Sequence, residues 1–298
     1  MRIMVTGVNG FIGSHICKIL LQDHHEIVGI GTQLTCDTQG IQYIHADIVS
    51  PEFASKLKTR LNSCDVIIHA AACILMEPFN DRVLDVNCKG TNHILELATK
   101  ISCQQLIHTS SLPIIGFPTE LPIIEEQLPK PKTLYHISKL AAEHIVKQSD
   151  RYGIKAVNLR ISSPIGAGMN EKTFLPILLR KSLANEPITI YGKGLRRQNY
   201  IDVRDIAEFV MGCINNNLTG TYNVAAETVI SNIDLAKLCI QITNSTSEIV
   251  YSGKNDPEEN YRWEVSIAKA KKHFGFNPKY SIADSIIDIL DYWKMRNQ

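Results

Sequence analysis

The sequence lacks most of the features that mark proteins of membranes, nucleic acids or the secretory route. Its 298 residues carry a formal net charge of only +1, so nothing in the charge favours nucleic acid or an anionic membrane as a partner. No apolar run is long enough to cross a bilayer. The opening residues do not resemble a secretory leader, because glycines and an asparagine interrupt them. We therefore expect a cytoplasmic protein with neither a membrane nor nucleic acid as its partner.

The eight cysteines are spread along the chain without a single CxxC pair. That spacing gives no support for a zinc site or a dithiol redox motif, and we expect no metal site. Cys17, Cys88, Cys213 and Cys239 lie within apolar runs, where a reduced thiol behaves as a small buried hydrophobe. The cysteine pattern therefore favours buried, reduced thiols over a disulfide framework.

Short β-rich runs alternate with helical patterns through the first half of the chain. The strand-like runs are Arg2–Thr6, Ile27–Ile30, Gln42–His45, Asp65–His69 and Leu106–Thr109. Between them, Phe11–Gln22 and Leu84–Lys100 carry apolar residues at helical spacing. Such alternation implies parallel strands joined by right-handed crossovers. The predicted fold class is therefore α/β, a doubly wound parallel sheet of the Rossmann type.

A glycine-rich turn follows the first strand. Gly7, Gly10 and Gly13 stand between the strand Arg2–Thr6 and the helix Phe11–Gln22. Glycines at this place allow a tight turn, a close approach of the backbone to a pyrophosphate, and close packing of helix on strand. The helix N-terminus adds free N–H groups and the positive end of its dipole. The turn predicts a dinucleotide site, although its spacing is GxxGxxG and not the GxGxxG of the usual fingerprint.

The second strand carries no residue that identifies the cofactor's 2′ group. NAD-binding units commonly place Asp or Glu at its end, where this sequence has Gly31 and Thr32. Arg2 and Arg60, the only arginines among the first sixty residues, are not placed to accept a 2′-phosphate. We expect NAD, and NADP stays open as an alternative.

After about residue 165 the strand and helix pattern loosens. We expect residues 1–165 to form the dinucleotide-binding sheet domain, with residues 200–226 partly returning to it. Residues 166–199 and 227–298 are then expected to form a smaller C-terminal lobe that binds substrate.

A tyrosine and a lysine share one face of a predicted helix. Tyr135 and Lys139 are four residues apart in a segment with helical periodicity. A lysine ammonium and the positive charge of an oxidised nicotinamide would both favour the phenolate, and so move its pKa toward the range useful for proton transfer. Ser110 and Ser111 follow the fifth strand, where a hydroxyl can donate to a substrate oxygen. Together these groups predict an enzyme that oxidises or reduces an alcohol.

The ordered motifs resemble those of extended short-chain dehydrogenases/reductases. The run TGVNGFIG at Thr6–Gly13 resembles the family's TGxxGFIG start, and Tyr135 and Lys139 match its YxxxK. Asn87 in VNCKGT, YIDVRD at Tyr200–Asp205 and AKA at Ala268–Ala270 match further family segments. Within that superfamily the resemblance is strongest to the NAD-dependent epimerase/dehydratase group, which acts on nucleotide-sugars.

The resemblance implies roles for individual residues. It places the catalytic hydroxyl five residues before Gly116, at Ser111, which would act with Tyr135 and Lys139; Ser110 can take its place if the register differs by one. Asn87 is expected to support the active site. The residues expected at the cofactor are Gly7, Asn9, Gly10, Phe11, Ile12, Gly13, Asp47, Ile48, Ala70, Ala71, Ala72, Asn87, Tyr135, Lys139 and Pro164. The residues expected at the substrate are Ser110, Ser163, Arg196, Arg197 and Arg262.

Departures from the family pattern limit the reactions that this chain can be expected to catalyse. Dehydratases of the group carry an acidic pair directly after the catalytic hydroxyl, and epimerase-reductases carry a cysteine there; this chain has Leu112-Pro113. An asparagine and an arginine that meet the sugar diphosphate in relatives are replaced by Ser163 and Gln198. His136, inside the YxxxK, is interpreted as a local packing choice. The reactions that remain as predictions are epimerisation and ketone reduction, both by simple hydride transfer.

The sequence therefore predicts an NAD(P)-dependent nucleotide-sugar epimerase. A reductase of a keto-sugar or another carbonyl compound is the alternative, and a non-catalytic dinucleotide-binding protein is a third reading. The expected partner is a nucleotide-diphosphate sugar. The resemblance further implies a homodimer through the helices at Leu84–Lys100 and Tyr135–Gln148.

Overall fold

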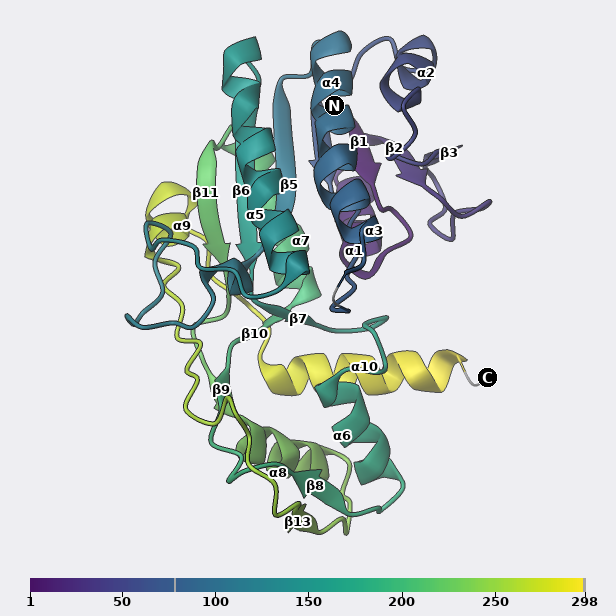
Figure 1. The fold of residues 1–298 in the computed structure, drawn as a ribbon. Helices are drawn as coiled ribbons and strands as arrows, with labels where there is room; N and C mark the ends of the chain where they lie inside the picture. Colours follow the sequence, from purple (N-terminus) through teal and green to yellow (C-terminus); the bar gives the residue numbers. More distant parts are fainter. Residues whose placement is uncertain (78, 297–298) are drawn as a thin grey trace.

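The computed structural model describes residues 1–77 and 79–296 and is built around a seven-stranded sheet (Figure 1). Its spatial order is β11-β6-β5-β4-β1-β2-β3, and every neighbouring pair runs parallel. The strands are β1 (Arg2–Thr6), β2 (Glu26–Gly31), β3 (Gln42–His45), β4 (Val66–His69), β5 (Gln105–Ser111), β6 (Lys155–Ile161) and β11 (Gly220–Val224).

Helices cover both faces of this sheet, and each face has its own apolar core. On one face lie α1 (Phe11–Gln22) and α7 (Val203–Asn215), which pack against each other. On the other face lie α2 (Phe53–Arg60), α4 (Thr91–Lys100) and α5 (Leu134–Lys147) (Figure 1). Strands covered on both faces need apolar residues throughout, which explains the short apolar runs in the sequence. The predicted doubly wound α/β fold is confirmed.

The strand order reverses between β1 and β4. From β1 the chain proceeds outward through β2 to β3, and from β4 it proceeds in the opposite direction through β5 to β6. The connections leaving β1 and β4 therefore diverge, which leaves a crevice beyond the carboxyl ends of these two strands. The glycine turn and the segment Ala70–Ala72 both lie at this edge.

Two local predictions differ from the structure. The expected helix Leu84–Lys100 consists of α3 (Arg82–Leu84), a π-helical turn η1 (Asp85–Gly90) and α4. The fifth strand ends at Ser111 and not at Thr109, because its last residues continue to pair with β6. Ser110 and Ser111 therefore belong to the strand, which decides how their side chains are directed.

A second, smaller lobe lies at the carboxyl edge of the sheet (Figure 1). It has a separate apolar core, to which Leu179, Leu235 and Ile289 contribute. Its elements are α6 (Phe174–Leu183), β8 (Ile188–Ile190), β9 (Arg197–Gln198), β12 (Ile230–Ser231), α8 (Asn232–Ile242), β13 (Ile249–Tyr251) and α10 (Ile282–Arg296). Between the lobes, β7 (Ser163–Ile165) pairs in parallel with β10 (Tyr200–Asp202). That the smaller lobe binds substrate stays a prediction.

The chain returns to the sheet domain twice. α7 and β11 place residues 203–224 on the sheet, within the expected segment 200–226. The helix α9 (Ala268–Phe274) also packs there, because Ile267, Ala270 and Phe276 belong to the core beneath α1 and α7. The expected continuous lobe 227–298 is therefore interrupted by a second excursion to the sheet.

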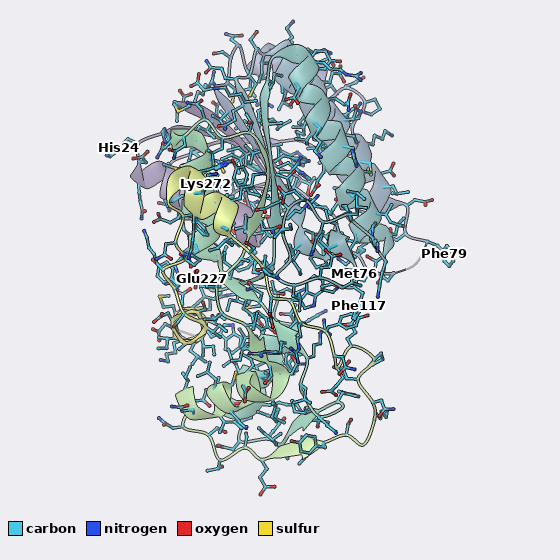
Figure 2. All side chains as sticks on the ribbon, turned by 90° about the vertical axis from the view of Figure 1, so that its left-hand side faces the viewer. His24, Met76, Phe79, Phe117, Glu227 and Lys272 are labelled. Atoms are coloured by element: carbon cyan, nitrogen blue, oxygen red, sulfur yellow. The ribbon has the colours of Figure 1, made fainter. Side chains whose placement is uncertain are left out.

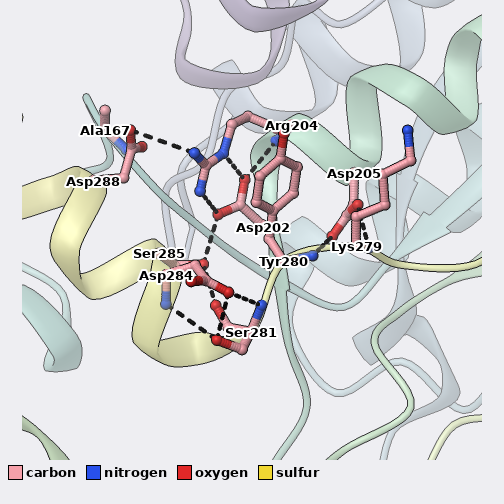
Figure 3. A network of polar contacts seen from close by, with 10 residues as sticks. All are labelled: Ala167, Asp202, Arg204, Asp205, Lys279, Tyr280, Ser281, Asp284, Ser285 and Asp288. Carbon is pink, nitrogen blue, oxygen red and sulfur yellow. Dashed lines mark hydrogen bonds and ion pairs between the residues drawn. The ribbon is translucent and has the colours of Figure 1, made fainter.

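A polar network fastens the two lobes together (Figure 3). Asp202, which caps α7, accepts from Arg204 Nε and Nη2 at 2.8 Å and from the Ser285 hydroxyl of α10 at 2.6 Å. The Arg204 guanidinium lies 3.8 Å from the centre of the Tyr280 ring. Asp205 accepts from the backbone N–H of Tyr280 at 3.2 Å. These bonds fix the start of α10 against the start of α7.

Five of the eight cysteines are buried. All eight cysteines are free, and burial raises the pKa of Cys17 and Cys103 to about 12, so these thiols stay protonated. Across residues 1–77 and 79–296, no helix combines the length and the apolar character needed to traverse a bilayer.

The contact between α1 and the glycine turn yields a stability prediction. A Cβ on Gly13 would lie 2.2 Å from the Gly7 carbonyl oxygen, which is backbone and cannot move aside. We expect Gly13→Ala to lower the free energy of unfolding by about 3 kcal/mol, the upper end for overpacking. Urea unfolding of the cofactor-free protein measures the change.

Gly153→Ala is the matched control. Gly153 has φ +69° with nothing within 4 Å of an added Cβ, so only left-handed backbone strain of about 1 kcal/mol is expected. Equal stability of the two variants would show that helix α1 does not depend on this close approach.

Candidate active site

A cavity of about 320 Å³ opens where the strand order reverses. It lies beyond the carboxyl ends of β1, β2 and β4, where ligands of doubly wound sheets bind. Of the expected cofactor residues, those lining it are Gly7, Gly10, Asp47, Ile48, Ala70, Ala71 and Ala72.

The glycine turn fits a dinucleotide for steric reasons. Gly7 has φ +68°, and a Cβ there would lie 2.7 Å from the Ala71 backbone nitrogen. Gly10 precedes α1 as its cap residue and offers no side chain to the first-turn N–H groups. Those N–H groups and the helix dipole are therefore directed at whatever lies against the turn, as a pyrophosphate requires. The residues present fit the cofactor that the motif predicts.

Other expected cofactor residues lie outside this cavity. Asn9 and Phe11 line a neighbouring hollow, and Asn9 Nδ2 donates to Gln33 Oε1 at 2.5 Å. Ile12 and Gly13 belong to the body of α1, and Pro164 lies in β7 opposite Ile201. Their contacts with a cofactor stay predictions.

The cavity also has lining residues outside the expected cofactor set. Thr32, Cys73, Arg82 and Val86 contribute to its wall, and Arg82 is the one basic residue among them. Arg82 belongs to no motif, because its position depends on how the chain enters the π-helical turn after β4. Gly31 is there too, which agrees with the absence of an acid at the end of β2.

Tyr135 lies in the first turn of α5 and is 8% exposed. Thr133 caps this helix by accepting from the His136 backbone N–H at 3.2 Å. Burial raises the pKa of Tyr135 to about 12, while hydrogen bonding from the Ser111 side chain acts in the opposite direction. The structure thus brings together the expected hydroxyl and phenol, with the phenol protonated at neutral pH.

Lys139 lies one turn further along α5 and is buried. Its Nζ is 3.2 Å from His108 Nε2, and His108 Nδ1 is 2.8 Å from Asn158 Oδ1. The Asn158 amide is oriented by its own donation to the Glu143 carbonyl oxygen at 3.3 Å. His108 therefore carries its hydrogen on Nδ1 and presents the Nε2 lone pair to the ammonium.

The histidines beneath Lys139 are neutral. Burial, followed by the charge of Lys139, lowers the pKa of His69 to about 3 and that of His108 well below its ordinary value. His69 is held between the hydroxyls of Thr6 and Thr91, at 2.8 and 3.0 Å. Burial also lowers the pKa of Lys139 to about 8, although Glu143 and Cys88 act to raise it.

Ser110 does not take the role expected of it. Its buried hydroxyl donates to Glu143 Oε1 at 2.6 Å, and Glu143 pairs with Arg160 at 3.0 Å. Ser110 and Ser111 are consecutive residues of strand β5, so their side chains point in opposite directions. Ser110 is directed beneath α5, and Ser111 contacts Tyr135. This geometry gives Ser110 a supporting contact with α5, and its expected contact with substrate stays a prediction.

Asn87 joins the loop after β4 to the catalytic helix. Its side chain accepts from the Cys73 N–H at 2.8 Å and donates to the Cys73 carbonyl at 3.0 Å. It also donates to Ser138 Oγ at 2.9 Å. Asn87 is 2% exposed and does not line the cavity, so its geometry is that of a supporting residue.

A second cavity, of about 250 Å³, lies between the lobes next to the catalytic group. Met76, at its rim, is seen in Figure 2 at the level where the lobes meet. Of the expected substrate residues, Ser163 and Arg196 line this cavity. The other lining residues are Leu112, Pro113, His136, Ser162, Gln198, Asn199, Glu258 and Trp263.

Only one of the three expected arginines lies at this cavity. Arg196 lines it and forms an ion pair with Glu258 at 2.5 Å. Arg197 and Arg262 are exposed and are joined to each other by a backbone bridge. Their contact with a substrate stays a prediction.

The burial of Lys139 yields a pH-dependent prediction. We expect Lys139→Met to raise the free energy of unfolding of the cofactor-free protein by about 2 kcal/mol near neutral pH. The lowered pKa of Lys139 corresponds to a cost of about 3 kcal/mol for the buried charge, and loss of the His108 contact offsets about 1 kcal/mol. Lysine has a pKa of 10.5 in the unfolded chain and of about 8 here in the folded protein. Between these two pH values the unfolded chain binds more protons than the folded one, so the stability of the wild type rises as the pH rises.

Urea unfolding near neutral pH and near pH ~10 measures both effects, since the advantage of the variant shrinks at the higher pH. Lys147→Met, at the exposed end of α5, is the control and is expected to change stability by less than about 0.5 kcal/mol. A Lys139→Met protein less stable than the wild type near neutrality would refute the unfavourable burial.

Comparison with known proteins agrees with this geometry. The model of the NAD dependent epimerase/dehydratase family matches residues 3–225. The UDP-glucose 4-epimerase of Streptococcus mutans is 27% identical, over 96% of this chain and 95% of that protein. The human dTDP-D-glucose 4,6-dehydratase is 26% identical, over 98% and 90%. The Thermotoga maritima UDP-glucose 4-epimerase structure has the same fold, with a TM-score of 0.90 at 22% identity and full coverage of both chains. The chain belongs to the NAD-dependent epimerase/dehydratase family.

Proposed function

We propose that this protein is a nucleotide-sugar 4-epimerase that acts on a UDP-hexose with bound NAD. The observation that supports this most is the place of the catalytic group between two cavities. Tyr135 and Ser111 are followed in the chain by His136 and Leu112, which line the second cavity. The same helix is tied through Asn87 to Cys73, which lines the first.

The chain's own groups account for the proton transfer. Ser111 holds the reacting sugar oxygen by donating to it, and Tyr135 takes the hydroxyl proton and later returns it. Lys139 favours the phenolate by its charge, one helical turn away. NAD, when bound, supplies the hydride acceptor and a positive ring charge that further favours the phenolate. Burial raises the pKa of the Tyr135 phenol to about 12, so a positive charge at the cofactor site would bring it closer to the range useful for proton transfer.

The second cavity favours epimerisation over elimination. Leu112 and Pro113 form its wall directly after Ser111, where a dehydratase needs an acid and a base. Among the described lining residues the one carboxylate is Glu258, and it is already paired with Arg196. Simple hydride removal and return requires no further acid or base.

We further propose a homodimer located in the cytoplasm. Ile137 on α5 is 47% exposed and Leu84 is 38% exposed, so the predicted dimer helices present apolar surface. Eight free thiols suit a reducing compartment. Light scattering of the purified protein tests the dimer, and a monomeric mass would contradict it.

Tyr135→Phe tests the proposed activity. We expect interconversion of UDP-glucose and UDP-galactose to fall at least about 100-fold, because the acid-base group is lost, while NAD binding is retained. The wild type should show no net formation or use of NADH during turnover. Coupled sugar assay and absorbance of the nicotinamide measure the two quantities.

Tyr152→Phe is the control, since that phenol is 61% exposed and outside both cavities. Unchanged epimerisation by Tyr135→Phe would exclude the assigned role. Stoichiometric oxidation of added NADH by a keto-sugar would show a reductase instead.

A further inference from the structure

The wall of the second cavity holds a buried donor without a partner. The Trp263 side chain is 9% exposed, yet its Nε1–H makes no hydrogen bond within the described chain. A buried N–H left unpaired costs about 1–3 kcal/mol, so such groups are rare unless a ligand meets them. Trp263 lines the second cavity, so a ligand bound there is the nearest source of a partner for this N–H.

His136, a second ring in the wall of the same cavity, also has a free N–H group. The Thr133 hydroxyl accepts from the His136 backbone N–H at 3.2 Å and lies 2.9 Å from His136 Nδ1. No other acceptor contacts this hydroxyl in the described structure, so its hydrogen goes to Nδ1 and the ring carries its own hydrogen on Nε2. Burial lowers the pKa of His136, so the ring is neutral at pH ~7. Among residues 1–77 and 79–296, nothing forms a hydrogen bond with Nε2–H, which is therefore available to a ligand.

The remaining polar groups of the wall leave the cavity without net charge. Arg196 is balanced by Glu258. With its amide turned to Arg196, the Gln198 oxygen accepts from Nε and Nη2 at 2.9 and 2.8 Å, which leaves its NH₂ group as a further donor. Asn199 is satisfied by Ser162 and by the backbone of Ala226. The wall is therefore rich in neutral donors.

We propose that Trp263 and His136 determine which sugar is accepted, by donating their ring N–H groups to oxygens of an uncharged hexose. This inference rests on the proposed function. A hydroxyl or an N-acetyl carbonyl oxygen satisfies both donors at no electrostatic cost. A uronate would bring a carboxylate into a cavity whose one cation is already paired, and burying such a charge is unfavourable. The site therefore takes neutral UDP-hexoses in preference to UDP-glucuronate.

Tryptophan fluorescence tests the contact directly, because the chain has only two tryptophans. Trp293→Phe leaves Trp263 as the single emitter, and Trp293 lies in α10, away from both cavities. We expect saturable quenching or a spectral shift with UDP-glucose and with UDP-N-acetylglucosamine, and at least about tenfold weaker binding of UDP-glucuronate. Emission unmoved by saturating UDP-glucose would overturn the proposal.

The kinetics of two variants distinguish a role in selecting the sugar from a purely structural role of these side chains. Trp263→Phe keeps an aromatic ring but removes the donor, so we expect KM for the neutral sugar to rise about tenfold, the size of one hydrogen bond, with kcat changed less. His136→Leu should act similarly, and His136→Gln, which keeps an N–H donor, should restore most of the lost affinity. The preference for UDP-glucose over UDP-glucuronate should shrink in both donor-less variants.

The outcomes distinguish this inference from the proposed function. If the wild type epimerises no UDP-sugar, the function fails, and the fluorescence titration still decides whether Trp263 meets the ligand. If the wild type epimerises UDP-glucose while Trp263→Phe and His136→Leu keep its KM and selectivity, the inference fails alone. A wild-type preference for UDP-glucuronate would also overturn it.

Discussion

The position of Tyr135 depends on one buried ion pair. Glu143 on α5 and Arg160 on β6 have side chains only 1% and 5% exposed, with both oxygens of the carboxylate engaged by the guanidinium. Leaving one of these charges alone in such a place costs about 3–5 kcal/mol, so the pair strongly restricts the register of α5 along the sheet. In that register Lys139 and Tyr135, one and two turns nearer the helix start, face the carboxyl end of β5. The candidate active site is therefore positioned by an ion pair that lies outside both cavities.

The fold and the core of the cofactor site could be predicted because the signals that specify them are local. Period and length distinguish strands from helices, and alternation of the two restricts the sheet topology. The turn containing Gly7, Gly10 and Gly13 needs glycine for reasons that hold wherever a strand leads directly into a helix. Tyr135 and Lys139 are likewise four residues apart on one helix face, so their proximity follows from spacing alone.

The rest could not be predicted because it depends on contacts between distant segments. His108 meets Lys139 across a strand and a helix, and Trp263 reaches the second cavity from a segment more than a hundred residues after Ser111. The contact of Ser110 with Glu143 could not be predicted, because it depends on a strand that continues two residues further than expected. His136 was taken as packing, since only the contact of its ring with Thr133 shows that a free N–H remains.

Lys139 and Trp263 have the same effect on the stability of the ligand-free protein. A buried ammonium with a lowered pKa and a buried N–H without a partner both reduce the stability of the cofactor-free chain. Neither group improves packing, and Met and Phe would fill the same space at lower cost. Under the proposed function, hydrogen-bond acceptors on the cofactor and on the sugar would offset this unfavourable free energy at the two points. The same arrangement would make the proposed sites selective, because a ligand that fails to supply the missing hydrogen-bond partner leaves the cost in place.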